Sequence, residues 1–186
     1  MSDKETSDWV EKMRHSAAHV MADASPIRRV VKRICIGPSI EDGFYYDFEL
    51  PRPLTPDDLP QIEDKMKESI AQNVPFIKEE ASKEEARKIF ARQPYKLELI
   101  DELPDEKVTI YKQGAFTDLC RGPHILTTGR LKAFKLLSVA GAYWRGNEKN
   151  KMLNDWNGRR KYCFTHFYSS TKPWSLNYLH LELTLQ

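Results

Sequence analysis

The chain has few of the features typical of membrane proteins, secreted disulfide scaffolds or highly charged complexes. Its 186 residues include only three cysteines, Cys35, Cys120 and Cys163. An odd number at wide spacing disfavours a disulfide framework and favours a reducing compartment. No apolar run approaches the roughly 20 residues of a membrane span. The polar start, MSDKETSDWVEK, does not resemble a signal peptide. We therefore expect a soluble, cytoplasmic domain.

The chain also has little net charge. A formal charge of +2 does not by itself indicate nucleic-acid binding, so any basic surface must be local. The second half has a local basic bias, which suits either phosphate contacts or a solvated face. Its residues are Arg121, Arg130, Lys132, Lys135 and Arg145. With 40% apolar and 30% charged residues, the composition is that of an ordinary globular domain with its own core.

Hydrophobic periodicity predicts a mixture of helices and strands. A helix opening at Asp8 carries one apolar stripe, and Ser25-Pro26 should end it. A second helix begins after Thr55, and a short third one opens at Ser82. Strands are expected within 36–50 and over 74–81, 95–100, 107–113 and 134–144. The expected fold is α+β, with an antiparallel sheet and helices packed mainly on one face.

The composition changes after Met152, where aromatic residues are scattered without a clean period. We therefore divide the chain into a domain over residues 1–153 and a divergent C-terminal appendage over 154–186.

Two pairs of residues that can ligate metals stand out. His15 and His19 are four apart on the first predicted helix, so they point the same way and lie roughly opposite the apolar stripe. Cys120 and His124 are four apart around an Arg-Gly-Pro turn. Three histidines and one cysteine form a sound ligand set for tetrahedral zinc. A single His-x-x-x-His pair is equally compatible with a solvated helix face, but two such pairs together favour a functional site.

Asp118 and Lys96 are less specific signals. A lone aspartate in a turn usually caps backbone N–H groups, and a strand lysine is usually a surface residue. Either would take part in proton transfer if it lay close to the histidines.

Four stretches taken together resemble the editing domain of threonyl-tRNA synthetases: RHSAAHVMADA, IGPSIEDGFYYDFE, PYKLELIDELPDEKVTIYKQGAFTDLCRGPH and FKLLSVAGAYWRGNEKNKML. They run in order from about residue 10 to residue 153, and DLCRGPH and GAYWRG are the most specific strings. The resemblance implies the fold shared with the editing domains of alanyl-tRNA synthetases.

The resemblance also implies an activity: hydrolysis of serine wrongly esterified to threonine tRNA, with the mischarged tRNA as partner and a separate threonyl-tRNA synthetase as a second one. Serine lacks only one methyl group of threonine, which is worth about 1–3 kcal/mol of discrimination, so a hydrolytic second sieve is needed. The positions that match the family's catalytic residues are His15, His19, Lys96, Asp118, Cys120 and His124. Those that match substrate-binding residues are Gly37, Tyr46 and Arg121. Among these, His15 and Lys96 are expected to move protons.

Three further expectations follow from the resemblance. In alanyl-type relatives the same four ligand positions hold zinc, whereas the threonyl type implies no obligatory metal. The alternatives are therefore a zinc-dependent editor of Ser-tRNA(Ala), with His15, His19, Cys120 and His124 as ligands, and a non-catalytic or tRNA-binding remnant. Residues 25–35 and 154–186 depart from the family pattern, and the motifs for ATP-dependent activation are absent, so no aminoacylation by this chain is expected.

Overall fold

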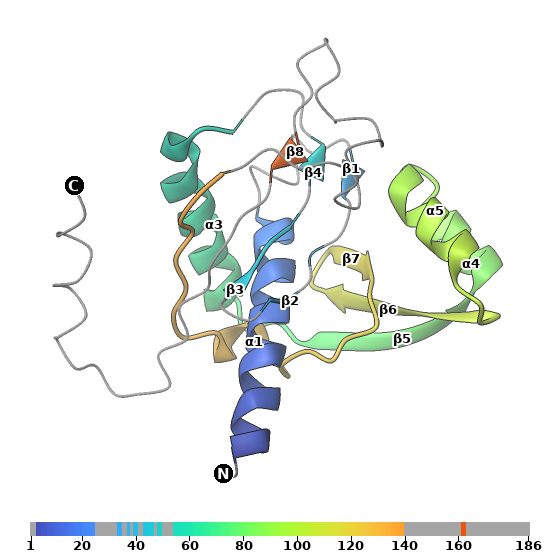
Figure 1. Ribbon diagram of the computed structural model, residues 1–186, viewed down its shortest axis with the longest axis horizontal. Helices are drawn as coiled ribbons and strands as arrows, with labels where there is room; N and C mark the ends of the chain where they lie inside the picture. The colour runs from blue at the N-terminus through green and yellow to red at the C-terminus, as the bar shows by residue number, and fades with distance from the viewer. Residues whose placement is uncertain are drawn as a thin grey trace, which may run out of the picture.

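The computed structural model describes residues 3–24, 33–34, 37, 39–40, 43–46, 48–49, 54–139 and 161–162 (Figure 1). Among these residues the helices are α1 (Asp3–Asp23), α3 (Leu59–Ala71), α4 (Lys83–Ile89) and α5 (Pro94–Glu102), with 3-10 turns at Pro56–Asp58 and Thr128–Arg130. Their longest strands, β5 (Phe76–Ser82), β6 (Lys107–Gln113) and β7 (Phe116–Leu119), form an antiparallel sheet in that order. The predicted α+β class is confirmed.

Short strands complete the described part of the chain. β2 (Ser39–Ile40) and β3 (Gly43–Phe44) form an antiparallel pair. β4 (Phe48–Glu49) lies between β1 (Arg33–Ile34) and β8 (Lys161–Tyr162). The predicted aromatic strand is therefore divided into separate short pieces. Strand β8, which pairs with β4, is the only part of the chain beyond residue 153 that the structure describes, so the division into a domain and an appendage stays a prediction.

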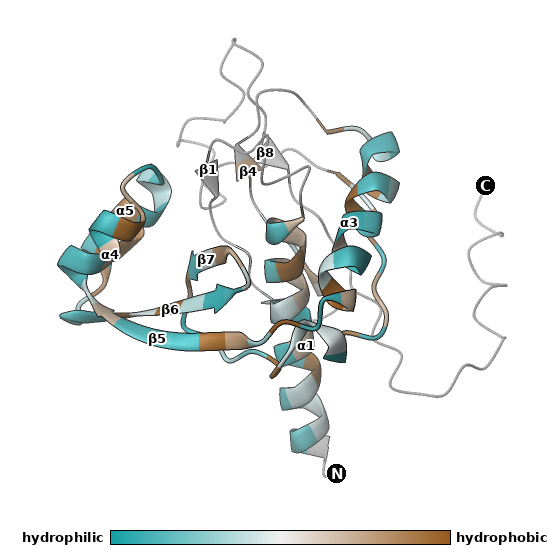
Figure 2. Cartoon of the chain, turned by 180° about the vertical axis from the view of Figure 1, so that it is seen from behind, coloured by the Kyte–Doolittle hydropathy of each residue, from teal (hydrophilic) through white to brown (hydrophobic). Residues whose placement is uncertain are grey.

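Helix α1 is the centre of the larger core. It packs against α3 and the β2–β3 pair, and its predicted apolar stripe is buried at Met13, Ala17, Val20, Met21 and Ala24. Figure 2 shows hydrophilic residues along the outer side of α3 and hydrophobic ones on the side toward α1. The helix begins at Asp3 rather than at Asp8, so the predicted cap is wrong; residues before Asp8 continue the helix on its exposed face.

Local sequence signals explain the other helix boundaries. The backbone N–H of Thr55 donates to the Asp58 carboxylate at 2.8 Å, closing the predicted capping box ahead of α3. Ser82 caps α4 by accepting from the backbone N–H of Glu85. Asn73 takes a left-handed conformation, with φ of 51°, just after α3, which is a common helix stop.

One predicted strand is wrong, and another is wrong over the residues that the structure describes. Residues 95–100 lie within helix α5 instead: Pro94 stands at its first turn, and the leucines and glutamates that follow favour a helix over a strand. Residues 134–139 are irregular, and 140–144 lie outside the described residues. That segment is attached to α3 through buried Glu63, which accepts from the Leu136 N–H at 2.7 Å and from Lys135 at 2.9 Å.

A second, smaller core lies under α4 and α5. It contains Ala86, Phe90, Ile100, Val108 and Ile110. Figure 1 shows both helices on one side of β5 and β6. Lys96 lies one turn before Ile100 on the same buried face of α5, so the packing of that helix directs a lysine toward the sheet. In the described part of the chain no helix is long and apolar enough to cross a bilayer.

Candidate active site

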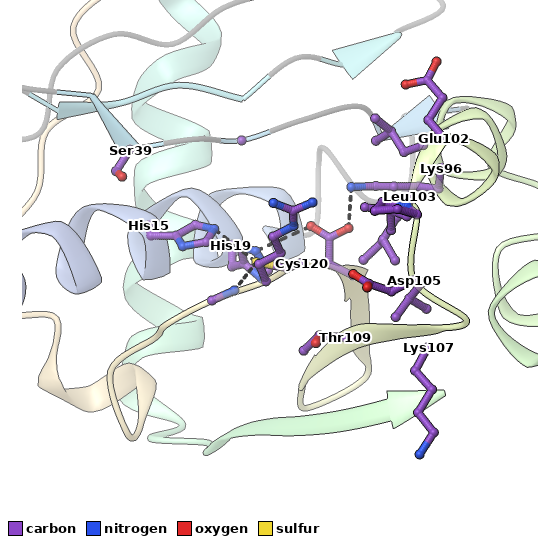
Figure 3. Close-up of a pocket in the computed structure, with 18 of the residues that line it drawn as sticks. His15, His19, Ser39, Lys96, Glu102, Leu103, Asp105, Lys107, Thr109 and Cys120 are labelled. Atoms are coloured by element: carbon purple, nitrogen blue, oxygen red, sulfur yellow. Dashed lines mark hydrogen bonds and ion pairs between the residues drawn. The ribbon is translucent and has the colours of Figure 1, made fainter. Parts of the chain in front are cut away.

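A cleft of about 760 Å³ lies between α1, α5 and the β6–β7 ladder. Seven of the nine predicted site residues line it: His15, His19, Gly37, Lys96, Asp118, Cys120 and the exposed Arg121. In Figure 3, His15 and His19 enter from α1, and Lys96 reaches across from α5. The structure therefore gathers residues that are widely separated in the sequence.

Asp118 is the centre of one hydrogen-bonded group. Its Oδ1 lies 2.6 Å from Nζ of Lys96, and both side chains are nearly inaccessible, at 4% and 3% exposure. The Tyr46 hydroxyl donates to Oδ2 at 2.6 Å. His19 Nε2 lies 3.5 Å from the same oxygen. A carboxylate with a cation and a hydroxyl as close partners can stay charged although it is buried.

Cys120 is the centre of a second group. Its Sγ lies 3.2 Å from Nε2 of His15 and 3.3 Å from Nε2 of His124. The backbone N–H of Gly122 donates to the same sulfur at 3.2 Å. His15 lines the cleft, whereas His124 is packed behind it against Phe76, with ring centroids 4.9 Å apart.

Burial keeps the three histidines and Cys120 uncharged. It lowers the pKa of His15, against the raising effects of Asp118 and the Pro123 carbonyl. Burial also lowers the pKa of His19 well below its ordinary value, and the charges of His15 and Lys96 add to that effect. The pKa of His124 falls for the same first reason, followed by the effects of His19 and His15. Burial raises the pKa of the Cys120 thiol to about 12. Near pH 7 the rings are neutral imidazoles and the sulfur is a thiol.

Two predictions about placement need correction. His19 is 2% exposed, so the alternative of a solvated helix face is wrong for it. Tyr46 is fully buried and does not line the cleft; it lies behind Asp118, with its ring against Gly37. A Cβ atom on Gly37 would lie 2.1 Å from Cδ2 of Tyr46, so only glycine allows this approach.

The four predicted ligands do converge. One donor atom from each of His15, His19, Cys120 and His124 lies within 4.8 Å of the others, as a metal ion would require. The set of three imidazoles and one sulfur suits zinc. Nδ1 of His19 is buried and has no hydrogen-bond partner among the described residues.

Sequence reasoning missed two neighbours of the site. Ser16 is completely buried on α1, and its Oγ lies 3.1 Å from Nδ1 of His124. Tyr111 packs on the His124 ring, with centroids 4.4 Å apart, and fills the space where Gly122 lacks a Cβ. A serine in a helix and a tyrosine in a strand carry no pattern that distinguishes them from ordinary packing residues.

Comparison with known proteins agrees with this architecture. Residues 108–154 match the family described as the threonyl and alanyl tRNA synthetase second additional domain. A threonine--tRNA ligase of Dehalococcoides mccartyi is 60% identical over 144 residues, which is 77% of this chain and 25% of that protein. The expected relationship to the threonyl-tRNA synthetase editing region is confirmed.

Other bacterial relatives show the same coverage. The threonine--tRNA ligase of Rubrobacter xylanophilus is 57% identical over 141 residues, covering 76% of this chain and 22% of that enzyme. The one from Lawsonia intracellularis is 52% identical over 152 residues, covering 81% and 24%. The chain thus spans about a quarter of the length of the curated relatives that it matches.

Proposed function

We propose that this editing-type domain hydrolyses the ester bond of tRNA(Thr) mischarged with serine. The observation that carries the proposal is the buried Lys96–Asp118 pair, 2.6 Å apart, in a cleft that also presents the neutral imidazole of His15. The threonine--tRNA ligase names of the relatives support threonine tRNA as the partner. We expect the domain to act in the cytoplasm, where aminoacyl-tRNA is used.

The chemistry needs a positioned water and a cation near the ester carbonyl. A neutral His15 accepts a proton as water oxygen bonds to the carbonyl carbon. Lys96, fixed by Asp118, faces the negative charge that develops on the carbonyl oxygen. The ester C–O bond then breaks, the proton passes to the terminal hydroxyl of the tRNA, and serine leaves as a free acid. Cys120, with its raised pKa, serves as part of the wall, with its sulfur 3.2 Å from Nε2 of His15, and not as a nucleophile.

The convergence of four ligand atoms favours one second candidate, a zinc-dependent editor of the alanyl type that acts on Ser-tRNA(Ala). His15, His19, Cys120 and His124 would hold the ion, which would supply a Lewis acid for the ester carbonyl.

One assay separates these candidates. The full chain is incubated with Ser-tRNA(Thr) and Ser-tRNA(Ala), with and without chelator, beside His15→Ala and a Lys65→Ala control. Lys65 lies on α3 with a side chain that is 40% exposed, and it pairs only with Glu68, 2.6 Å away, among the described residues. We expect hydrolysis of Ser-tRNA(Thr) that survives chelation and is lost in His15→Ala alone. Loss on chelation with preference for Ser-tRNA(Ala) would favour the zinc editor. If all the proteins are inactive although urea melts show that they are folded, the result would favour a non-catalytic tRNA-binding remnant.

A further inference from the structure

Ser16 lies between His15 and His19 on α1 but does not face the cleft. It is completely buried, and its hydroxyl has three polar neighbours. Oγ lies 2.7 Å from the carbonyl oxygen of Lys12, 3.0 Å from the backbone nitrogen of Ile125 and 3.1 Å from Nδ1 of His124. A hydroxyl has one hydrogen and two lone pairs, so these contacts use all of its capacity.

The identity of each partner fixes the direction of each bond. The Lys12 carbonyl can only accept, and at 2.7 Å two oxygens without a hydrogen between them would repel, so the Ser16 hydrogen lies there. The Ile125 N–H can only donate, and it uses one lone pair of Oγ. What remains toward His124 is the second lone pair. Nδ1 of His124 must therefore carry the hydrogen and donate it to Ser16.

A neutral imidazole carries one N–H, so Nε2 of His124 is left with its lone pair. That nitrogen lies 3.3 Å from Sγ of Cys120. It can accept the thiol hydrogen but cannot donate to the sulfur. The thiol hydrogen of Cys120 therefore points to His124. Nε2 of His15 lies 3.2 Å from the same sulfur but does not have to accept that hydrogen. His15 is the ring of the two that lines the cleft.

We propose that Ser16 is a positioning residue: its buried hydroxyl fixes His124 in the Nδ1–H tautomer and thereby keeps the thiol hydrogen of Cys120 away from His15. The functional consequence rests on the proposed hydrolase activity, because it leaves the His15 nitrogen available to a water in the cleft. The tautomer itself follows from the hydrogen bonds of Ser16 alone.

The tautomer can be observed directly by NMR of imidazole-labelled, chelator-treated protein. The sequence has five histidines, and the spectrum of His124→Asn assigns the ring. We expect Nδ1–H in the wild type, a mixture of tautomers in Ser16→Ala, and Nδ1–H again in Ser16→Thr, whose hydroxyl can make the same bonds. An Nε2–H tautomer in the wild type would overturn the proposal, and so would a Ser16→Ala spectrum that keeps pure Nδ1–H. If Ser16→Ala does not fold, the wild-type spectrum alone decides.

The control is Ser82→Ala, because Ser82 also loses hydrogen bonds on mutation but caps α4 and has no contact with His124 among the described interactions. It should lower stability and leave the His124 tautomer unchanged. Hydrolysis of Ser-tRNA(Thr) should fall on the order of tenfold in Ser16→Ala, as for other residues that orient a site group, and recover in Ser16→Thr. A wild type that hydrolyses nothing would refute the proposed function, while the NMR spectra would still decide the tautomer.

Discussion

Nζ of Lys96 and Oδ1 of Asp118 lie 2.6 Å apart, and the two side chains are almost completely buried at the meeting point of α5 and β7. The pair joins the smaller core under α4 and α5 to the cleft beside α1. Because each charge has been removed from water, each depends on the other for compensation.

Removing one residue of the Lys96–Asp118 pair should therefore lower the stability of the fold strongly. We expect Lys96→Met to lower the free energy of unfolding by about 3–5 kcal/mol, since it leaves a buried carboxylate without its cation. The double variant Lys96→Met/Asp118→Asn should lose less than the sum of the single changes. Urea unfolding measures both. Lys65→Met is the matched control, because its pair with Glu68 is exposed and should contribute under about 1 kcal/mol. Equal losses in Lys96→Met and Lys65→Met would contradict the role of burial.

Tyr46 should act through its hydroxyl on the same carboxylate. Tyr46→Phe removes the 2.6 Å bond to Oδ2 of Asp118 but keeps the ring stacked on Phe48, 4.9 Å away. A hydrogen bond to a charged group is worth about 1.5–3 kcal/mol, and we expect a loss of that size together with slower hydrolysis of Ser-tRNA(Thr). Tyr46→Leu should lose more, because the stacking is also removed. Unfolding and deacylation measurements that show Tyr46→Phe unchanged would mean that Asp118 is fixed by Lys96 alone.

Two glycine-to-alanine substitutions test whether hydrolysis depends on the position of the Tyr46 ring. Gly37→Ala would place a Cβ 2.1 Å from the Tyr46 ring, so the ring or the backbone must move and the Asp118 contact must weaken. Gly114→Ala is the control: its φ of +56° makes alanine strained, yet its nearest neighbour would be 3.9 Å away. We expect Gly114→Ala to cost about 1 kcal/mol of stability with normal hydrolysis. Gly37→Ala should slow hydrolysis even when the protein is folded. The deacylation rates of the two folded variants, measured at one temperature, test this difference.

Features with a fixed period were predictable from the sequence. His15 and His19 converge because a helix places residues four apart on one face, and the Ser82 and Thr55 caps depend only on their near neighbours. The helix at α5 was misassigned because Tyr95 and Ile100 suggested a strand, although Pro94 and the intervening leucines and glutamates favour a helix.

Contacts between distant elements were not predictable in the same way. Nothing in the spacing of Tyr46, Lys96 and Asp118 shows that the segment between β3 and β4, a helix and a strand bring them together. Lys96 and Asp118 were weak signals by themselves, and the resemblance to the family is what grouped all three. Even then Tyr46 was expected among the substrate-binding residues, whereas it lies behind Asp118 and does not line the cleft. Ser16 was not found at all, because its role depends on Ile125 and His124, which a sequence pattern does not connect to it.

The three histidines of the site should make the metal-free protein sensitive to mild acid. The pKa values of His15, His19 and His124 are all lowered in the folded state, chiefly by burial. The unfolded chain, with pKa values near about 6.5, therefore takes up protons first as the pH falls. Their stabilising effect is fully present above that value and is lost below it, by up to about 1.4 kcal/mol per pH unit for each ring.

Urea unfolding in chelator between pH 7.5 and 5.5 measures this loss before most carboxylates begin to titrate. We expect a flat free energy of unfolding above about pH 7 and a steady fall below about pH 6.5. His124→Asn should reduce the slope by the share of one ring, because an amide does not titrate, while Lys65→Ala should leave it unchanged. A stability that rises on acidification would show that the rings gain protons on folding, which their burial in an apolar setting opposes.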